Sequence, residues 1–436
     1  MVLKQIYNAF DPFRPLPAGD PVYVDCRQVR GDGDILVELG QKIFFSNQKT
    51  CQLYAGHRGA GKSTELLRLK KHLEDNGCFV VYFAADEEDI DPEDAQYTDI
   101  LLACTRHLLE GLNNVNPQPL LNWLGGRWQE LKDLALTEIS LESLSLEGKI
   151  SQFAKITGNL RAVPSLRQQI RERVNPHTTS LLEALNQFIT EAKRNLPPGY
   201  SQLAVLADNL DRIVPVIQAD RRINHDHIFI DRCEQLKALD CNLVYTVPIS
   251  MLYSSKAVEM RDTYGQPHIL PMIMVRTREN KVYEPGLKKL KEVIAKRVSQ
   301  VAPNYSLESD IFDQQETLEQ LCLMSGGHVR NLLLLMQQAT IRTPNLPITA
   351  TAVKRAISEA RNTYRHTVDD DYWLELAKVS TSKKIRNNNL HRSLLFNRCL
   401  LEYRYLDTKG EIKRWCDVHP LLKDTDEFRE ALNQVS

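Results

Sequence analysis

The sequence has no apolar run of the roughly 18 residues that a membrane-spanning helix needs. Its first residues, Met1–Gln5, lack the basic-then-apolar order of a signal peptide. The nine cysteines are scattered without a Cys-x-x-Cys pair, and the formal net charge of −1 gives no attraction of the whole molecule to nucleic acid. We therefore expect a cytoplasmic protein with no membrane span, no disulfide and no zinc site.

What is present is ordinary for a folded protein. The chain has 436 residues, of which 42% are hydrophobic and 25% are charged. This length exceeds one typical hydrophobic core, so two or three domains are expected.

One stretch fits the phosphate-binding loop pattern, in which two glycines five apart precede a lysine and a hydroxyl residue. Its residues are Gly56, His57, Arg58, Gly59, Ala60, Gly61, Lys62, Ser63 and Thr64. A short apolar strand is expected before it at 51–55, and a helix with leucines at helical spacing after it at 65–73. The sequence therefore predicts a nucleotide site built as strand, loop and helix.

Each residue type has a chemical role in such a loop. Glycines allow the backbone to aim successive N–H groups inward, and the following helix adds its positive N-terminal end. Lys62 is expected to reach the β- and γ-phosphates, and the Ser63 hydroxyl to ligate Mg²⁺. Thr64 either meets the α-phosphate side or satisfies the first helical turn.

Two further strands are expected to follow. The run 78–85 is continuously apolar, as in a parallel strand covered on both faces, and its acidic tail Asp86–Asp89 is interpreted as a solvated loop. The run 203–208 ends in acids, where a carboxylate can hold Mg²⁺ through water. Asp208 is the first choice for that role and Asp211 the second, with a turn cap as its alternative.

Other stretches complete the expected core. Residues 242–248 are expected to form a strand. At its polar end Thr246 is a candidate sensor of the γ-phosphate, and Ser250 is the other candidate. For each of them, an ordinary structural role in the strand or loop is equally open. From about 97 to 198 the pattern is mostly helical, which indicates an insertion. Within it, the apolar positions Ile139, Leu141, Leu144 and Leu146 fit either a hairpin or a frayed helix.

A pair of glycines, Gly326 and Gly327, separates two helical patterns and is followed by Arg330. A glycine pair that ends one helix, with an arginine in the first turn of the next, can direct a guanidinium at a bound phosphate.

In this order, the motifs resemble the additional-strand ATPases of the AAA+ and STAND type, particularly those similar to origin-recognition ATPases. The resemblance covers about 20–360. The run Asp208–Arg212 also resembles the KAP branch of STAND-like NTPases, so the branch stays open. The resemblance implies an ATP-driven conformational switch that uses ATP and Mg²⁺, with Arg330 as the lid sensor.

The expected fold class is α/β, a P-loop NTPase with a mainly parallel sheet, a helical insertion, a helical lid and a C-terminal winged-helix-like domain. The expected divisions are an N-terminal linker and helix at 1–48, the ATPase core at 49–303, the lid at 304–366 and the last domain at 367–436. In that last domain we expect two helices and a hairpin around 403–415.

One residue departs from the AAA+ pattern. Where members of that class carry glutamate directly after the Mg²⁺ aspartate, this chain has Asn209. An amide cannot accept the proton of an attacking water, so slow hydrolysis is expected.

The last domain is rich in basic residues, which are compatible with a DNA backbone footprint or with a charged surface that docks protein. They are Lys383, Lys384, Arg386, Arg392, Arg398, Lys409, Lys413 and Arg414. Three functions are therefore carried forward. The leading one is a nucleotide-controlled switch for self-assembly or for activating a protein partner; the others are a DNA-binding ATPase of the initiator or transposition-regulator type and a non-hydrolysing nucleotide-binding scaffold.

Overall fold

A computed structural model describes residues 2–112, 115–126 and 161–435, together with the single residues Gly148, Ser151 and Lys155. The chain divides into two compact units. The first comprises Met1–Asp34, Gly56–Arg68 and Ile269–Ser436, and the second comprises Ile35–Ala55 and Leu69–His268. The apolar positions Ile139, Leu141, Leu144 and Leu146 lie outside the described residues.

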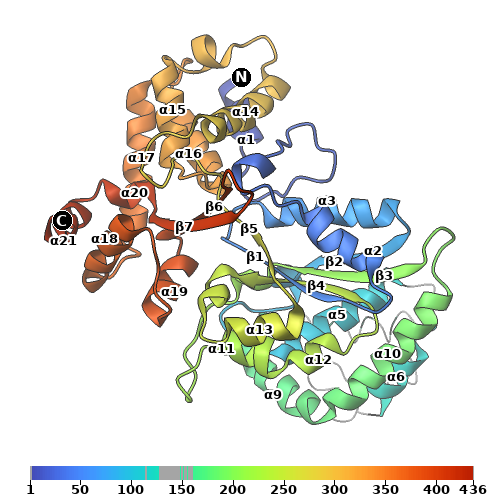
Figure 1. The fold of residues 1–436 in the computed structure, drawn as a ribbon. Helices are drawn as coiled ribbons and strands as arrows, with labels where there is room; N and C mark the ends of the chain where they lie inside the picture. Colours follow the sequence, from blue (N-terminus) through green and yellow to red (C-terminus); the bar gives the residue numbers. More distant parts are fainter. Residues whose placement is uncertain are drawn as a thin grey trace. The chain divides into compact units, whose positions relative to one another are not determined.

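Five strands form the main sheet (Figure 1). They are β1 (Cys51–Gly56), β2 (Cys78–Ala84), β3 (Gln202–Asp208), β4 (Asn242–Pro248) and β5 (His268–Leu270). The order across the sheet is β2-β3-β4-β1-β5. The first four match the strands expected from continuous apolar runs, whereas the three residues of β5 give too short a pattern to be recognised in the sequence.

The strand β4 lies between β1, which leads into the phosphate loop, and β3, which ends at Asp208. Pairing of β2 with β3 and of β3 with β4 is parallel, and the register aligns Ala84 with Asp208. An extra strand between these two is the feature for which the additional-strand ATPases are named. The expected α/β class with a mainly parallel sheet is confirmed.

Helices of the second unit cover both faces of this sheet, with α2 on one side and α5, α10 and α12 on the other (Figure 1). Before the insertion come η2 (Leu36–Gly40), α2 (Gln41–Phe45) and α4 (Ala85–Glu88). The insertion contains α5 (Tyr97–Gly111), α6 (Gln118–Gly125), α9 (Pro164–Val174), η5 (Asn175–His177) and α10 (Thr178–Arg194). After β3 come η6 (Leu210–Arg212), α11 (Asn224–Asp226), η7 (His227–Asp231), α12 (Cys233–Lys237), η8 (Ile249–Tyr253) and α13 (Ala257–Tyr264).

The interpretation of Asp86–Asp89 as a solvated loop is wrong. These residues lie at and just after α4, and the Asp89 side chain is only 1% exposed. Its carboxylate pairs with Arg106 at 3.0 Å and with His107 at 2.8 Å. The local sequence contains four acidic residues and does not indicate that Arg106 and His107 of α5 pair with one of them. The burial of Asp89 could therefore not be predicted from the sequence.

The first unit begins with α1 (Val2–Ala9) and the short helix η1 (Arg27–Val29). Its helical lid region contains η9 (Leu307–Ile311), α15 (Gln315–Met324), α16 (Val329–Ile341) and α17 (Ala350–Arg365), preceded by α14 (Glu284–Val301). Helix α16 packs against α17, and α1 packs against both α14 and α16. The N-terminal helix is therefore part of the same helical cluster as the lid.

The C-terminal part holds the expected two helices and hairpin. Its elements are η10 (Asp370–Tyr372), α18 (Trp373–Ser382), α19 (Asn389–Phe396), β6 (Leu400–Leu406), β7 (Ile412–Val418), α20 (Pro420–Lys423) and α21 (Asp426–Val435). Strands β6 and β7 pair antiparallel from Leu400 with Val418 to Leu406 with Ile412. Among the described helices of the chain, none is long and apolar enough to cross a membrane.

The glycine pair between α15 and α16 gives the first prediction. Gly327 has φ +77°, and a Cβ there would lie 1.7 Å from the Ile273 carbonyl oxygen, whereas Gly410 has φ +75° and open space around it. We expect Gly410→Ala to lower the free energy of unfolding by about 1 kcal/mol through backbone strain alone. Gly327→Ala should cost about 3 kcal/mol, because a backbone clash is added to the same strain. Urea denaturation of both variants measures the difference; equal losses would contradict the close approach.

Candidate nucleotide site

The phosphate loop joins the end of β1 at Gly56 to α3 (Lys62–Asp75). Gly59 and Gly61 have φ of +83° and +110°, in the left-handed region that favours glycine. The loop turns where the Ala60 N–H donates to the His57 carbonyl at 3.1 Å. The structure therefore places glycines where the backbone requires them, as the motif predicts.

Lys62 lies over the beginning of the loop. Its Nζ donates to the carbonyl oxygens of Gly56 and His57, at 3.0 Å each, and the residue is only 5% exposed. An ammonium at this position can form charge-assisted hydrogen bonds with a phosphate.

The next two loop carbonyls are held by the lid. His328 Nδ1 accepts from the Asn331 N–H at 3.1 Å, so its Nε2 carries the proton and donates to the Arg58 carbonyl at 2.6 Å. The Arg330 N–H donates to the Gly59 carbonyl at 3.1 Å. The structure thus brings Arg330 and the phosphate loop together, within one unit.

The remaining loop carbonyls are also occupied. Arg30 Nη2 donates to the Ala60 carbonyl at 2.9 Å, and the Glu65 N–H donates to the Gly61 carbonyl at 3.1 Å. Every carbonyl from Gly56 to Gly61 therefore accepts a hydrogen bond from a fixed donor. Carbonyls held in this way are restrained from turning toward a ligand, as an anion-binding loop requires.

The N-terminal segment before α3 touches both the loop helix and Arg330. The Leu16 N–H donates to Thr64 Oγ1 at 3.1 Å, and Arg330 Nε donates to the Pro12 carbonyl at 3.2 Å. The Arg330 guanidinium also lies over the Phe13 ring, 5.6 Å from its centroid. The N-terminal segment 12–16 therefore contacts two of the predicted site residues, Thr64 and Arg330. Nothing in the sequence of this segment indicates these contacts.

The C-terminal hairpin also contacts the loop. His57 Nε2 accepts from the Glu402 N–H of β6 at 3.0 Å, and Arg58 lies over the Phe396 ring at 5.9 Å. The sequence predicts His57 as a residue of the nucleotide-binding loop. Its role in joining the loop to β6 depends on a partner 345 residues away, which the sequence does not reveal.

Three histidines around this loop are fully or almost fully buried. Burial, and then the charges of Lys62 and Arg398, lower the pKa of His57 to about 3. Burial and the charge of Arg398 lower the pKa of His419 to about 3 and that of His328 well below its usual value. All three histidines are therefore neutral at pH 7 and add no positive charge near the loop.

The acidic strand end lies in the second unit. Asp208 is 0% exposed; its Oδ2 accepts from the Tyr82 hydroxyl at 2.9 Å and its Oδ1 from the Asn209 N–H at 2.7 Å. Burial and the Asp208 charge raise the pKa of Tyr82, so this hydroxyl stays a donor. A buried carboxylate oriented by neutral donors belongs to the oxygen ligand type that suits Mg²⁺.

Asn209, Asp211 and Thr246 are grouped with Asp208. Asn209 adopts φ +64°, and Asp211 is 3% exposed. Thr246 is fully buried; its Oγ1 accepts from the Leu210 N–H at 2.9 Å and donates to the Ala207 carbonyl at 3.4 Å. Its hydroxyl therefore fixes the turn after β3. The alternative sensor, Ser250, is also buried, in η8.

Three of the eight basic residues expected to form a DNA footprint are paired or buried. Lys383 pairs with Asp417 at 2.6 Å, Lys413 pairs with Glu411, and Arg392 is 7% exposed. Lys384, Arg386 and Lys409 are exposed and, within the part of the chain that the structure describes, take part in no ion pair. The exposed unpaired charge is thus much smaller than the sequence indicates.

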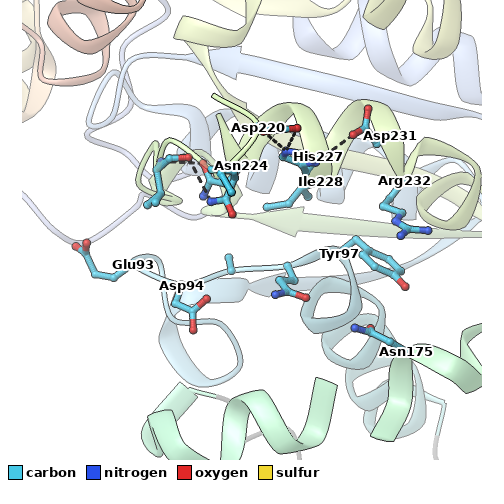
Figure 2. A pocket seen from close by; sticks show the side chains of 15 residues that line it. Glu93, Asp94, Tyr97, Asn175, Asp220, Asn224, His227, Ile228, Asp231 and Arg232 are labelled. Carbon is cyan, nitrogen blue, oxygen red and sulfur yellow. Dashed lines mark hydrogen bonds and ion pairs between the residues drawn. The ribbon is translucent and has the colours of Figure 1, made fainter. Parts of the chain in front are cut away.

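A pocket of about 670 Å³ lies in the second unit, between the segment before α5 and the residues around η7 (Figure 2). His227 stands between Asp220 and Asp231, 3.1 Å from each, and Arg232 lies over the Tyr97 ring at 5.0 Å. These polar groups bind one another, so the pocket points to no particular ligand. No group of three or more metal-ligating side chains occurs among the described residues.

Comparison with known proteins gives matches only to solved structures. No family model and no curated protein matches the sequence. The chain is similar to the ORC2 protein of Aeropyrum pernix, at 10% identity and a TM-score of 0.44, over 98% of this chain and 97% of that one. It is also similar to Cdc6p of Pyrobaculum aerophilum, at 12% identity and a TM-score of 0.40, over 98% of both chains.

A third similar structure is a Walker-type ATPase of Pyrococcus abyssi, at 11% identity and a TM-score of 0.42, over 98% of this chain and 99% of that one. All three similarities are of low sequence identity. With identities of 10–12% and TM-scores below 0.5, they carry no statement about what this chain binds or does.

The buried histidines predict a pH dependence. Their pKa values in the folded protein, about 3 for His57 and His419, lie below the 6.5 of an exposed histidine. Between these values the unfolded chain binds more protons, so stability falls as the pH drops from 6.5 toward 3. His57 and His419 together should change the free energy of unfolding by up to about 3 kcal/mol per pH unit in that window, and His328 acts in the same direction.

Urea denaturation at pH 5 and pH 6 measures this slope. His419→Gln should reduce it by about 1.4 kcal/mol per pH unit, the share of one proton. The matched control is His366→Gln, since His366 is exposed in the same unit. An equal effect of both substitutions would contradict the assignment.

Proposed function

We propose that the chain is an ATP-binding ATPase of the AAA+ type, in which the nucleotide state controls self-assembly or the activation of a protein partner. The observation that carries the proposal is the phosphate loop whose carbonyls, from Gly56 to Gly61, are all held by fixed donors. The additional strand β4 and the contact of Arg330 with this loop support the class.

In this proposal the loop N–H groups and Lys62 bind the β- and γ-phosphates. Ser63 and Asp208 would hold Mg²⁺, Asp208 through water, and the ion would neutralise charge on the transferring phosphate. Thr64 would keep its hydrogen bond with the Leu16 N–H. The first turn of α3 would therefore respond to the position of the N-terminal segment 12–16.

The switch follows from the bonds around the loop. Arg58 and Gly59 are bonded to the lid through His328 and Arg330, and His57 is bonded to β6 through Glu402. A phosphate that shifts the loop backbone must change these bonds. We propose that Arg330 leaves Phe13 to read the γ-phosphate, because a cation–π contact with an exposed ring is worth only about 0.5–1 kcal/mol.

Slow hydrolysis completes the proposal. The Asn209 amide can orient water but cannot remove its proton. Asp211 is the other acid nearby in the sequence, buried in η6 and separated from Asp208 by a left-handed turn. A long-lived ATP state suits a switch better than a motor.

Removal of the phosphate ligand tests the binding proposal. Lys62→Ala should weaken ATP binding at least a hundredfold, because a buried charge-assisted contact is lost. Lys70→Ala is the matched control: it lies in the same helix and pairs with Glu74 at 2.6 Å. Calorimetric titration with ATP measures both. An ATP affinity unchanged by Lys62→Ala would remove the basis of the proposal.

A second experiment tests the catalytic base. Asn209→Glu should raise ATP turnover about tenfold or more, since a positioned base contributes roughly 10²–10⁴-fold. Asn209→Gln is the control, because it adds the same length without a carboxylate. Asp211→Asn should change turnover little. Brisk turnover of the unaltered chain that Asp211→Asn abolishes would instead assign the base to Asp211 and favour the KAP-like branch.

Mass measurement with ATP, with ADP and without nucleotide then distinguishes the remaining functions. A switch for self-assembly changes its mass with the nucleotide, and a non-hydrolysing scaffold shows binding without turnover. The DNA-binding alternative rests on the exposed cations Lys384, Arg386 and Lys409. Three phosphate contacts would give a slope of about −3 for log affinity against log salt concentration, as measured with duplex DNA and the full chain.

A further inference from the structure

Arg30 lies behind the phosphate loop and is nearly buried, at 8% exposure. It ends η1, and its Nη2 donates to the Ala60 carbonyl at 2.9 Å. Its Nε is buried and has no hydrogen-bond partner among the described residues. Arginine stays protonated in proteins, so this side chain brings a permanent positive charge to the loop.

No carboxylate of the described chain forms an ion pair with Arg30. Its neighbour Arg27 shows the contrast: that guanidinium pairs with Asp25 at 2.7 Å and also with Asp34. A buried charge without a partner is costly, and an anion that binds nearby relieves the cost.

The turn that carries Arg30 is held on both sides. The Val29 carbonyl accepts from the Met274 N–H at 2.9 Å. Gly31 has φ +80°, and a Cβ there would lie 3.0 Å from Arg404 Cβ in β6. Arg30 is therefore fixed against the loop.

We propose that Arg30 is a positioning residue of the nucleotide site. It fixes the Ala60 carbonyl on the outer side of the loop, and its charge is balanced by the polyphosphate bound on the inner side. This inference rests on the proposed function, since it requires a nucleotide at the loop. It adds a residue that lies outside the phosphate-loop motif, 26 positions before Gly56.

The test separates the charge of Arg30 from its hydrogen bond. Arg30→Gln keeps an N–H donor and removes the charge, whereas Arg30→Lys keeps both. We expect Arg30→Gln to weaken ATP binding at least tenfold, or about 1.4 kcal/mol, with a smaller loss for ADP and the smallest for AMP. Arg30→Lys should recover most of the ATP affinity. A merely structural role would lower the affinity for all three nucleotides equally.

The matched control is Arg27→Gln, which removes a paired guanidinium three residues away and should leave ATP affinity within about twofold. Calorimetric titration of each full-length variant with ATP, ADP and AMP gives the result. Wild-type ATP affinity in Arg30→Gln would overturn the inference, and so would equal losses in Arg30→Gln and Arg30→Lys.

Folding failures are also decisive. If Arg30→Gln or both variants fail to fold, the protein needs Arg30 without nucleotide, and the inference is wrong. If the unaltered chain binds no ATP, the proposed function is wrong. That result differs from one in which the chain binds ATP but the affinity does not depend on the charge of Arg30.

Discussion

Hydrogen bonding of the phosphate-loop carbonyls is the constraint on which the site depends. The donors come from four sources: the loop itself, Lys62 and Glu65 of α3, the lid residues His328 and Arg330, and Arg30 near the N-terminus. Because each backbone unit points its N–H and C=O in opposite directions, carbonyls held in this way also restrict the directions of the loop N–H groups. The loop is thus shaped by distant segments of the first unit, and any of them can alter it.

Electrostatics around the loop follow from burial. His57, His328 and His419 are kept neutral, so they join segments by hydrogen bonds without adding charge. Arg30 stays charged, as arginine does in proteins. This division matters because neutral hydrogen bonds can rearrange at low cost, whereas a buried charge requires an anion. Nucleotide binding would therefore act on charges and be transmitted through neutral bonds.

The acidic strand end follows a different rule. Asp208 is oriented by Tyr82 of β2, and Thr246 of β4 fixes the turn that contains Asn209. These residues come from three adjacent parallel strands, whose register aligns Ala84 with Asp208. Positions that a motif search regards as plain strand, such as Tyr82, thus set the geometry of the carboxylate. The slow hydrolysis that we propose depends on Asn209, which stands where the AAA+ pattern has glutamate.

The sequence by itself determined the loop, four of the five strands, the glycine pair before Arg330 and the C-terminal hairpin, because glycine positions and continuous apolar runs are local signals. Tertiary structure alone decided that β4 lies between β1 and β3, that Asp89 is buried, and that His57 meets Glu402. It also decided that Arg30 lies against Ala60 while Arg27, three residues away, is neutralised. The physical reason is that hydrogen-bond and charge partners far apart in the chain leave no periodic trace in it, whereas turns and core faces do.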